Sequence, residues 1–164
     1  MSFRYLDEND RDELEGLFEF VESNATHKDW WPPIRQEVRD HFFDFDWMRF
    51  VGNFEEERLV AVAGLFLHPF VFDHEAEAVG LDPAEVAEIG RCVVHPSCRG
   101  KNLMFSMSKQ LIDRALMMDR SWIIAAVHPD NVAGRKSLER LGMAEKGFIV
   151  QDDIYPRCIY AMHV

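Results

Sequence analysis

Hydrophobic positions in the first third of the chain predict one strand followed by two helices. Residues 3–6 are typical of a short strand, and residues 7–10 supply side chains that favour a helix N-terminus. Apolar side chains then recur at helical spacing to about Ser23, namely Leu14, Leu17, Phe18 and Val21. Pro32-Pro33 interrupts the chain, so we expect a second helix over residues 34–43.

The middle of the chain predicts a strand–turn–strand unit followed by a long connection. Residues 48–53 and 58–67 are apolar and rich in β-branched side chains, and the polar tip Glu55-Glu56-Glu57 separates them. Residues 68–87 break this rhythm with glycine and proline residues. We expect a loop here, with a short helix that begins at Asp82.

The second half of the chain predicts alternating strands and helices. Two of the strands end at a His-Pro pair, and a helix follows each of them. The expected elements are strands over residues 87–94 and 122–127, helices over 103–116 and 131–140, and final strands over 148–150 and 158–163.

This order of elements predicts an α/β (α+β) fold. A strand–helix–strand unit in the second half implies a parallel strand pair with a right-handed crossover, whereas the first half predicts antiparallel pairing. We therefore expect one mixed, mostly antiparallel sheet with a parallel pair and helices packed on it. We find no internal repeat, low-complexity tract or linker, which favours a single domain over residues 1–164.

Composition and charge exclude several classes of protein. Of 164 residues, 48% are hydrophobic, so the chain can bury a sizeable core. Acidic residues outnumber basic residues 29 to 18, and the formal net charge is −11. We therefore expect no nucleic-acid partner and no membrane partner, since both need an electropositive face. A solvated acidic surface explains the charge, and a cationic partner is allowed by it but not required.

Cysteine content and the N-terminal sequence indicate a cytoplasmic protein. The three cysteines form no C-x-x-C pair, which argues against a disulfide scaffold and a paired-cysteine zinc site. Residues 1–8 lack the basic start and apolar stretch of a signal peptide. No window of about 18 residues is apolar and uncharged, so we expect no membrane-spanning segment.

A basic turn after the strand at 87–94 is the most informative chemical feature. Arg99, Gly100 and Lys101 lie in an otherwise acidic chain, and a helix follows directly. A helix N-terminus offers free N–H groups and a partial positive charge, which together bind phosphate. An ordinary strand–helix connection fits the spacing equally well. The spacing matches neither a Walker loop nor a dinucleotide-binding fingerprint.

Two sequence blocks resemble the acetyl-CoA signature of the GNAT N-acetyltransferase superfamily. The first is VHPSCRGKNL at residues 94–103, and the second joins VHPDN at 127–131 to SLERLGM at 137–143. The order of elements is similar to that family over nearly the whole chain. The resemblance implies the acyl-CoA N-acyltransferase fold, in which the central parallel strands splay apart. It also implies direct transfer of an acetyl group from acetyl-CoA to an amine.

The resemblance also implies which residues bind the cofactor. In this family the pantetheine arm pairs with the strand at residues 92–94, and the pyrophosphate lies on the turn at 99–104. An asparagine contacts the cofactor from across the gap, and a backbone N–H near Val94 would stabilise the oxyanion. The residues so implied are Cys92, Val93, Val94, Arg99, Gly100, Lys101, Asn102, Leu103, Met104 and Asn131.

Departures from the family pattern affect both the turn and the mechanism. Asn102 and Met104 replace small residues of the turn; Asn tolerates a positive φ well, so we expect Asn102 to hold the turn, whereas Met104 is bulkier. The family often has a tyrosine general acid where this chain has Leu138. Tyr155 and Tyr160, from the C-terminal strands, are the candidate replacements.

For the catalytic base we favour Glu88. It lies on the strand that leads to the signature, where related enzymes often carry a glutamate that acts directly or through water. A structural carboxylate, or one at the rim of the site, explains the same residue equally well.

Other candidate groups have plainer explanations. His95 and His128 each precede a proline at a strand end, where turn residues are commoner than catalysts. Histidine and acidic residues within 68–75 match no metal-ligand spacing, so no metal is expected. The same connection, residues 68–87, would cover a cleft. Aromatic residues fit core packing better than a substrate pocket, which is the alternative for Trp30, Trp31, Phe42, Phe43, Phe70 and Phe72.

The sequence therefore predicts an acetyl-CoA-dependent N-acetyltransferase that acts on an amine of a small molecule or peptide in a ternary complex. A homodimer is allowed. One alternative is a GNAT-like module that binds CoA or acyl-CoA without efficient catalysis, which Met104 and Leu138 motivate; another is a protein–protein module with an aromatic interface. The acceptor stays open among amino acids, polyamines, aminoglycosides, peptide N-termini and lysine side chains. The acidic chain mildly favours a cationic amine.

Overall fold

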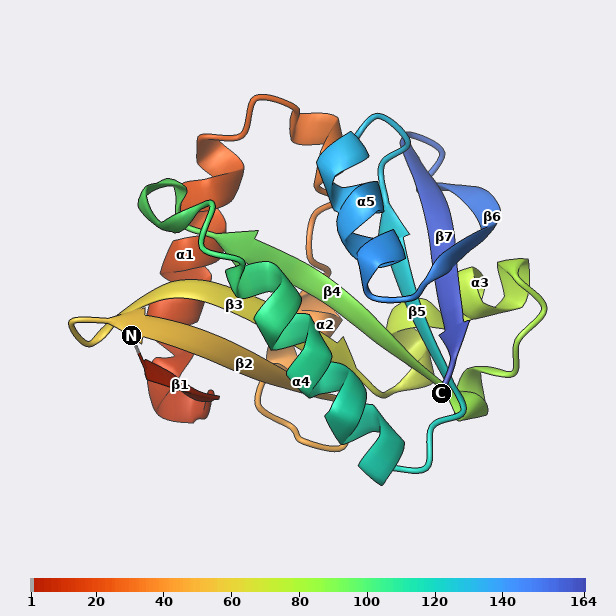
Figure 1. Cartoon of the computed structure of the whole chain (residues 1–164), viewed down its shortest axis with the longest axis horizontal. Helices are drawn as coiled ribbons and strands as arrows, with labels where there is room; N and C mark the ends of the chain where they lie inside the picture. The colour runs from red at the N-terminus through yellow and green to blue at the C-terminus, as the bar shows by residue number, and fades with distance from the viewer. Residues whose placement is uncertain (1) are drawn as a thin grey trace.

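A single mixed sheet forms the centre of the structure (Figure 1). The computed structural model describes residues 2–164, and its sheet has the strand order β1-β2-β3-β4-β5-β7-β6. Neighbouring strands are antiparallel except for the central pair β4–β5, which is parallel, so the predicted fold class is confirmed. The strands are β1 (Ser2–Tyr5), β2 (Met48–Glu55), β3 (Arg58–Phe66), β4 (Val86–Val94), β5 (Trp122–Val127), β6 (Ala144–Gln151) and β7 (Tyr155–His163).

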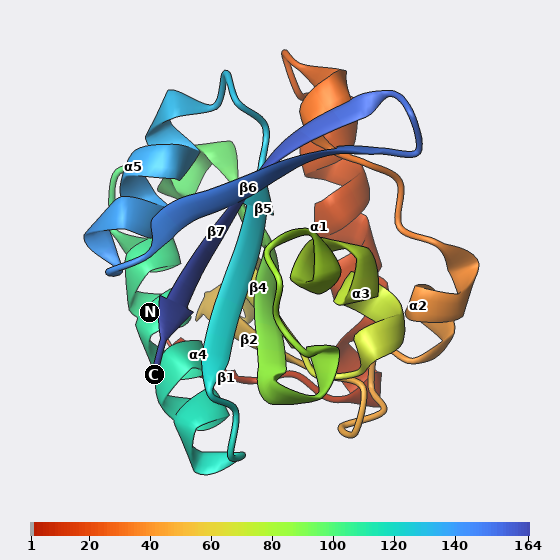
Figure 2. The same ribbon diagram turned by 90° about the vertical axis from the view of Figure 1, so that its right-hand side faces the viewer.

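Helices cover both faces of the sheet (Figure 2), and their buried side chains show which face each helix covers. Phe18 of α1 and Phe72 of α3 belong to one buried core, whereas Met107 of α4 and Leu138 of α5 belong to another. The first three helices thus cover one face, and α4 and α5 cover the other. The helices are α1 (Arg11–Ser23), α2 (Gln36–Asp40), α3 (Pro69–Ala78), α4 (Leu103–Met117) and α5 (Val132–Arg140), with 3-10 turns η1 (Glu8–Asp10), η2 (Lys28–Trp30), η3 (Pro83–Glu85) and η4 (Pro96–Cys98).

The central strands β4 and β5 are joined over three residue pairs. Residues 86–88 pair with residues 122–124. Beyond them β4 continues beside β3 while β5 continues beside β7, so the two strands diverge (Figure 1). An edge that lacks a partner strand presents free N–H and C=O groups. Backbone groups on both sides of this gap are therefore available to something other than the sheet.

A bulge lies where β4 begins to leave β5. Arg91 has a left-handed φ of 50°, and the register of β3 against β4 shifts between Val62 and Gly64. Bulges bend a strand and redirect a side chain. Here the bulged residue reaches away from the sheet, and its guanidinium donates to the carbonyl of Pro32.

Residues 68–87 were expected to form a loop, and this expectation is wrong because they contain α3. The Nδ1 atom of His68 accepts the N–H of Phe70 at 3.1 Å, and Pro69 takes the first helical position; both features favour a helix start. Phe72 and Ala76, four residues apart, are fully buried on the inner side of the helix. The short helix predicted at Asp82 is present as η3, and Asp82 caps it.

The helix expected over residues 34–43 is shorter than predicted. α2 ends at Asp40, because the chain turns at His41 and again at Asp44, whose carbonyl accepts the N–H of Trp47. The final strands, by contrast, are longer than predicted. The connection between the two predicted strands shortens to a turn at residues 152–154, and Tyr155 begins β7.

Candidate functional site

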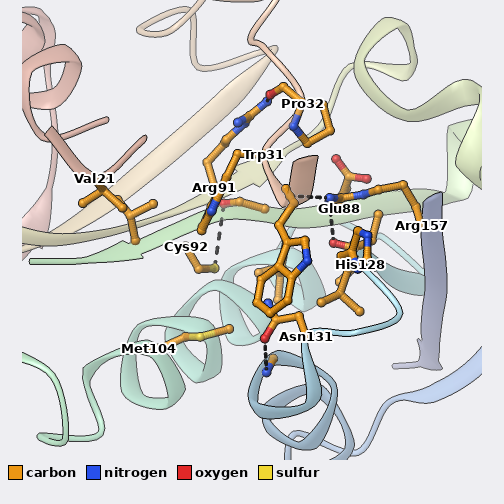
Figure 3. A pocket seen from close by; sticks show the side chains of 18 of the residues that line it. Val21, Trp31, Pro32, Glu88, Arg91, Cys92, Met104, His128, Asn131 and Arg157 are labelled. Atoms are coloured by element: carbon orange, nitrogen blue, oxygen red, sulfur yellow. Dashed lines mark hydrogen bonds between the residues drawn. The ribbon is translucent and has the colours of Figure 1, made fainter. Parts of the chain in front are cut away.

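The divergence of β4 and β5 opens a cavity of about 710 Å³ that extends to both faces of the sheet (Figure 3). Leu138, from the core beneath α4 and α5, and Phe42, from the core beneath α1, both line it. Residues 89–94 of β4 and 125–127 of β5 form its sides. The cavity therefore connects the turn before α4 with the space beneath the N-terminal helices.

The turn between β4 and α4 forms one end of this cavity. Gly100 has a φ of 81° and Asn102 a φ of 62°, both in the left-handed region. Glycine adopts this conformation without penalty, and asparagine does so more readily than most other residues. The expectation that Asn102 holds the turn is confirmed. Its side chain makes no cap bond to α4, so N–H groups of the first helical turn stay without intrahelical partners.

A second cavity, of about 340 Å³, adjoins the first at this turn and gathers basic side chains. Arg99 and Lys101 are exposed there. Arg140, at the end of α5, donates a 2.8 Å hydrogen bond to Oδ1 of Asn102 and lies 4.1 Å above the ring of Phe105. Sequence reasoning missed Arg140, because nothing in the local pattern places the end of α5 beside a turn that lies some forty residues earlier.

Asn131 begins α5 on the opposite side of the gap. Its Oδ1 accepts the N–H of Gly134 at 2.9 Å, and the residue lines the cavity. A Cβ atom at Gly134 would lie 2.7 Å from Nδ2 of Asn131, so a larger residue there would require the side chain of Asn131 to shift. The side chain of Asn131 is thus fixed by the helix that it caps.

The structure brings the sequence-predicted cofactor-binding residues together around these two cavities. The larger cavity is lined by Cys92, Val93, Val94, Arg99, Gly100, Met104 and Asn131. The smaller one is lined by several of the same residues and also by Lys101, Asn102 and Leu103. Burial raises the pKa of the Cys92 thiol to about 12, so it is a neutral wall of the cavity and not a nucleophile.

Glu88 lies at the opposite end of the cavity from the basic turn. It is the last residue of β4 that pairs with β5, and only 8% of it is exposed. Burial raises the pKa of its carboxyl well above the ordinary value, and the neighbouring Glu75 raises it further. The charges of Arg157, Arg91 and Arg35 act in the opposite direction.

Glu75 is a second buried carboxyl that sequence reasoning did not assign to the site. It projects from α3 into the cavity with 8% exposure, and burial raises its pKa too. Because α3 was not predicted from the sequence, nothing indicated that Glu75 lies beside the cavity. Val71 and Glu75 both line the cavity, but α3 is kinked between them at Phe72 (φ −137°, ψ 17°), so regular helical spacing would not have indicated their common position.

Arg157 on β7 is another cavity residue missed from the sequence. Its guanidinium donates to the carbonyls of Trp30 at 2.9 Å and Ala126 at 2.8 Å. Strand residues alternate between faces, and Arg157 shares its face with Ile159 and Ala161, which are buried. A charged residue at an inward-facing position of a strand was therefore the sequence feature that could have indicated Arg157.

A segment that we call the strap, residues 27–33, closes the cavity at this end. Arg91 binds the Pro32 carbonyl, Arg157 binds the Trp30 carbonyl, and Nε2 of His128 lies 3.3 Å from the Asp29 carboxylate. Side chains of β4 and β7, together with His128 just after β5, thus hold the strap, whose Trp30 and Trp31 line the cavity. Of the six aromatic residues singled out from the sequence, three line the cavity, namely Trp30, Trp31 and Phe42. Phe42 also belongs to the core, as does Phe72, whereas Phe43 packs against the core and Phe70 is exposed.

Neither candidate tyrosine is brought to the cavity. Tyr160 lies in the core on the α4–α5 face, where its hydroxyl accepts from Arg135 at 3.0 Å and donates to Glu139 at 3.3 Å. Tyr155 begins β7 and is not among the residues that line the cavity. The position where the family often has tyrosine, Leu138, is buried beside the cavity.

His95 and His128 act as turn residues. Nδ1 of His95 accepts the N–H of Ser97 at 3.1 Å, and Nδ1 of His128 accepts the N–H of Asp130 at 3.0 Å. Among residues 2–164, no three His, Cys, Asp or Glu side chains are grouped closely enough to hold a metal ion. No helix within the same range has the length and apolar character that crossing a membrane requires.

A mixed sheet split along its one parallel strand pair, with a glycine-containing turn and a helix N-terminus at the split, defines the acyl-CoA N-acyltransferase fold. The chain belongs to the GNAT acetyltransferase family, whose model, the Acetyltransferase (GNAT) family, matches residues 14–143. Among curated proteins, none matches this chain.

Solved structures share this fold at low sequence identity. A ribosomal-protein-alanine N-acetyltransferase from Brucella melitensis has a TM-score of 0.74, 16% identity and full coverage of both chains. An N-acetyltransferase from Staphylococcus aureus Mu50 has a TM-score of 0.72 and 15% identity, over 99% of this chain and 97% of its own. The Salmonella typhimurium protein yncA, solved with its cofactor acetyl-CoA, has a TM-score of 0.73 and 14% identity, over 99% and 93%.

Proposed function

We propose that this protein transfers an acetyl group from acetyl-CoA to a primary amine by direct attack in a ternary complex. The observation that carries the proposal is the continuity of the cavity. It leads from the basic turn at Arg99 and Gly100, through the split in the sheet, to the buried carboxyl of Glu88. A polyanionic donor and an amine acceptor can therefore approach one another from opposite ends of the cavity.

The residues at the turn fit acetyl-CoA. Free N–H groups at the start of α4 and the cations Arg99, Lys101 and Arg140 suit the phosphates. The unpaired edge of β4 at residues 90–94 suits the amide-bearing pantetheine arm, and Asn131 offers donors from across the gap. The family to which the chain belongs and the acetyl-CoA held by yncA support the same assignment.

Acetyl-CoA would supply a thioester carbonyl that the neutral amine attacks, so that a C–N bond forms and the C–S bond breaks. The thiolate would leave and take up the proton that the attacking nitrogen loses as the amide forms. We assign Glu88 as the base that takes the proton from the ammonium, directly or through water. Its raised pKa makes it a stronger base than an exposed carboxylate. A backbone N–H near Val94 on the open edge of β4 would stabilise the developing negative charge. Neither Tyr155 nor Tyr160 enters this scheme, because neither lines the cavity.

A second candidate function is the binding of CoA or acyl-CoA without efficient turnover. Met104 projects into both cavities at the turn, and Leu138 stands where a tyrosine acid is common in the family. Calorimetry with acetyl-CoA and a thiol-release assay over a panel of amino acids, polyamines, aminoglycosides and peptides separate the two. We expect binding together with amine-dependent thiol release. Binding without release from any member of the panel would favour the second function.

The role of Glu88 has its own test. Replacing it with glutamine should lower kcat/KM by about 10²- to 10⁴-fold, which is the usual contribution of a general base. Glu85→Gln, an exposed change three residues earlier, is the matched control and should leave kcat/KM unchanged. Equal activity of the two variants, with an unaltered pH profile, would remove Glu88 from the mechanism.

A further inference from the structure

The guanidinium of Arg157 is partly buried and lines the cavity. Within residues 2–164 it donates only to two carbonyls, no carboxylate lies within 4.0 Å, and its Nε is buried without a hydrogen-bond partner. The charges of Glu88 and Glu75 act on its pKa, but neither carboxylate forms an ion pair with it. An anionic group from outside the chain would complete this site.

Arg157 and Glu88 occupy the same corner of the cavity. They lie on β7 and β4, on either side of β5, and each is the largest opposite-charge influence on the pKa of the other. Figure 3 shows the two side chains next to each other below the strap. An acceptor that places its amine at Glu88 therefore has a cation within reach of a substituent on the neighbouring carbon.

Apolar side chains form part of the wall at this end of the cavity, beside the charged ones. Trp31 and Ile34, from the strap and the residue after it, face Phe66 of β3 and Val71 of α3 around the same space. Such walls bind an apolar or aromatic side chain and exclude a long hydrated one. They continue directly from the corner that Glu88 and Arg157 form.

The local charge does not favour a polycation. Arg35, Arg91 and Arg157 line this end, and the two carboxyls present, Glu75 and Glu88, both have raised pKa values and so are more readily neutral than ordinary carboxyls. The acidic excess that mildly favoured a cationic acceptor belongs to the molecule as a whole and not to this cavity.

We propose that the acceptor is a free α-amino acid with an apolar or aromatic side chain, its amine at Glu88, its carboxylate on Arg157 and its side chain among the apolar walls. This assignment rests on the proposed function. In an α-amino acid the amine and the carboxylate are attached to the same carbon atom. This close spacing suits Glu88 and Arg157, which lie next to each other. A peptide N-terminus, a polyamine or a lysine side chain lacks that carboxylate.

The wild-type protein tests the assignment in a thiol-release assay with acetyl-CoA and four probes: L-phenylalanine, L-phenylalaninamide, 2-phenylethylamine and spermidine. We expect kcat/KM for L-phenylalanine to exceed that for each of the others at least about 10-fold, because only it offers a carboxylate to Arg157. The amine of L-phenylalaninamide is less basic than that of L-phenylalanine, so it loses its proton more readily. A preference for the acid therefore cannot arise from easier deprotonation of its amine. Equal rates with acid and amide, or a preference for spermidine, would overturn the assignment.

Arg157→Gln adds a second measurement, with Arg58→Gln at an exposed site as its control. In Arg157→Gln the KM for L-phenylalanine should rise at least about 10-fold and the acid-to-amide ratio should fall towards one, while the KM for acetyl-CoA is retained. If folded Arg157→Gln protein keeps the wild-type acid-to-amide ratio, Arg157 does not bind the carboxylate of the acceptor. If Arg157→Gln does not fold, the wild-type comparison still decides. If none of the four probes reacts, the amino-acid assignment fails, whereas the proposed function fails only if the wider amine panel is inert as well.

Discussion

The guanidinium of Arg140 donates a 2.8 Å hydrogen bond to Oδ1 of Asn102, and this bond ties the end of α5 to the residue that precedes α4. The two helices cover the same face of the sheet and lie on opposite sides of the split between β4 and β5. Asn102 therefore has two roles: its backbone supplies the left-handed conformation of the turn, and its side chain fixes a cation beside it.

Substitutions at Asn102 separate these two roles. Asn102→Ala should lower the free energy of unfolding by about 1–2 kcal/mol, because alanine is strained at a φ of 62°. Asn102→Gly loses the same bond to Arg140 but accepts the backbone conformation, so it should be the more stable of the two. Chemical denaturation measures both values. Both variants should raise the KM for acetyl-CoA, and an alanine variant as stable as the glycine variant would contradict the strain argument.

Removal of the charge of Glu75 should shift the pH dependence of catalysis. Glu75 raises the pKa of Glu88, whereas Arg157, Arg91 and Arg35 lower it. In Glu75→Gln the acid limb of the kcat/KM profile should therefore move to lower pH. Glu77→Gln, at an exposed position of the same helix, provides the control. If the limb stays in place, the group that titrates is not Glu88.

Glu88→Gln should stabilise the protein while inactivating it. The folded state raises the pKa of Glu88, so it binds the proton more tightly than the unfolded chain does, and stability falls as pH rises from the ordinary pKa through the raised one. Glutamine carries no such cost. The gain in free energy of unfolding over wild type should thus be largest above the raised pKa and shrink towards pH 4.5. Denaturation at several pH values checks this, and a gain that grows towards low pH would show the opposite linkage.

The two glycines at helical positions should respond oppositely to alanine. At Gly134 the new Cβ would lie 2.7 Å from Nδ2 of Asn131, so the cap must shift, and we expect a loss of about 1 kcal/mol together with weaker acetyl-CoA binding. At Gly16, within α1, nothing lies within 4 Å of the new Cβ, and Gly16→Ala should add up to about 1 kcal/mol. Thermal unfolding and calorimetry distinguish them, and a neutral Gly134→Ala would show that the cap relaxes freely.

Features with a local cause were predictable from the sequence. The strand over residues 122–127 has the predicted bounds, Asn102 has the expected positive φ, and His95 and His128 serve their turns, because each depends on neighbouring residues. The cofactor-binding candidates gather at the two cavities because they lie on two strand ends that the parallel pair brings together.

Features that depend on tertiary contacts were missed. α3 presents Glu75, a charged residue, on the side that faces the cavity, so its pattern did not show an apolar helix face. Arg157 and Arg140 come from segments far along the chain from the groups that they approach. The strap has no regular structure beyond η2, and its position depends on three side chains from distant parts of the chain, namely Arg91, His128 and Arg157.

The three-pair junction between β4 and β5 also has a consequence for how cooperatively the molecule folds. β1 to β4 on one side and β5 to β7 on the other are two sub-sheets hinged along a short seam, and the strap spans them. Under the proposed function, acetyl-CoA would form hydrogen bonds to both strand edges at that seam. It would thereby replace the strand pairing that β4 and β5 lack there. The unliganded protein should then open along this seam at a lower free energy than it unfolds globally, and the bound ligand should merge the two halves into one cooperative unit.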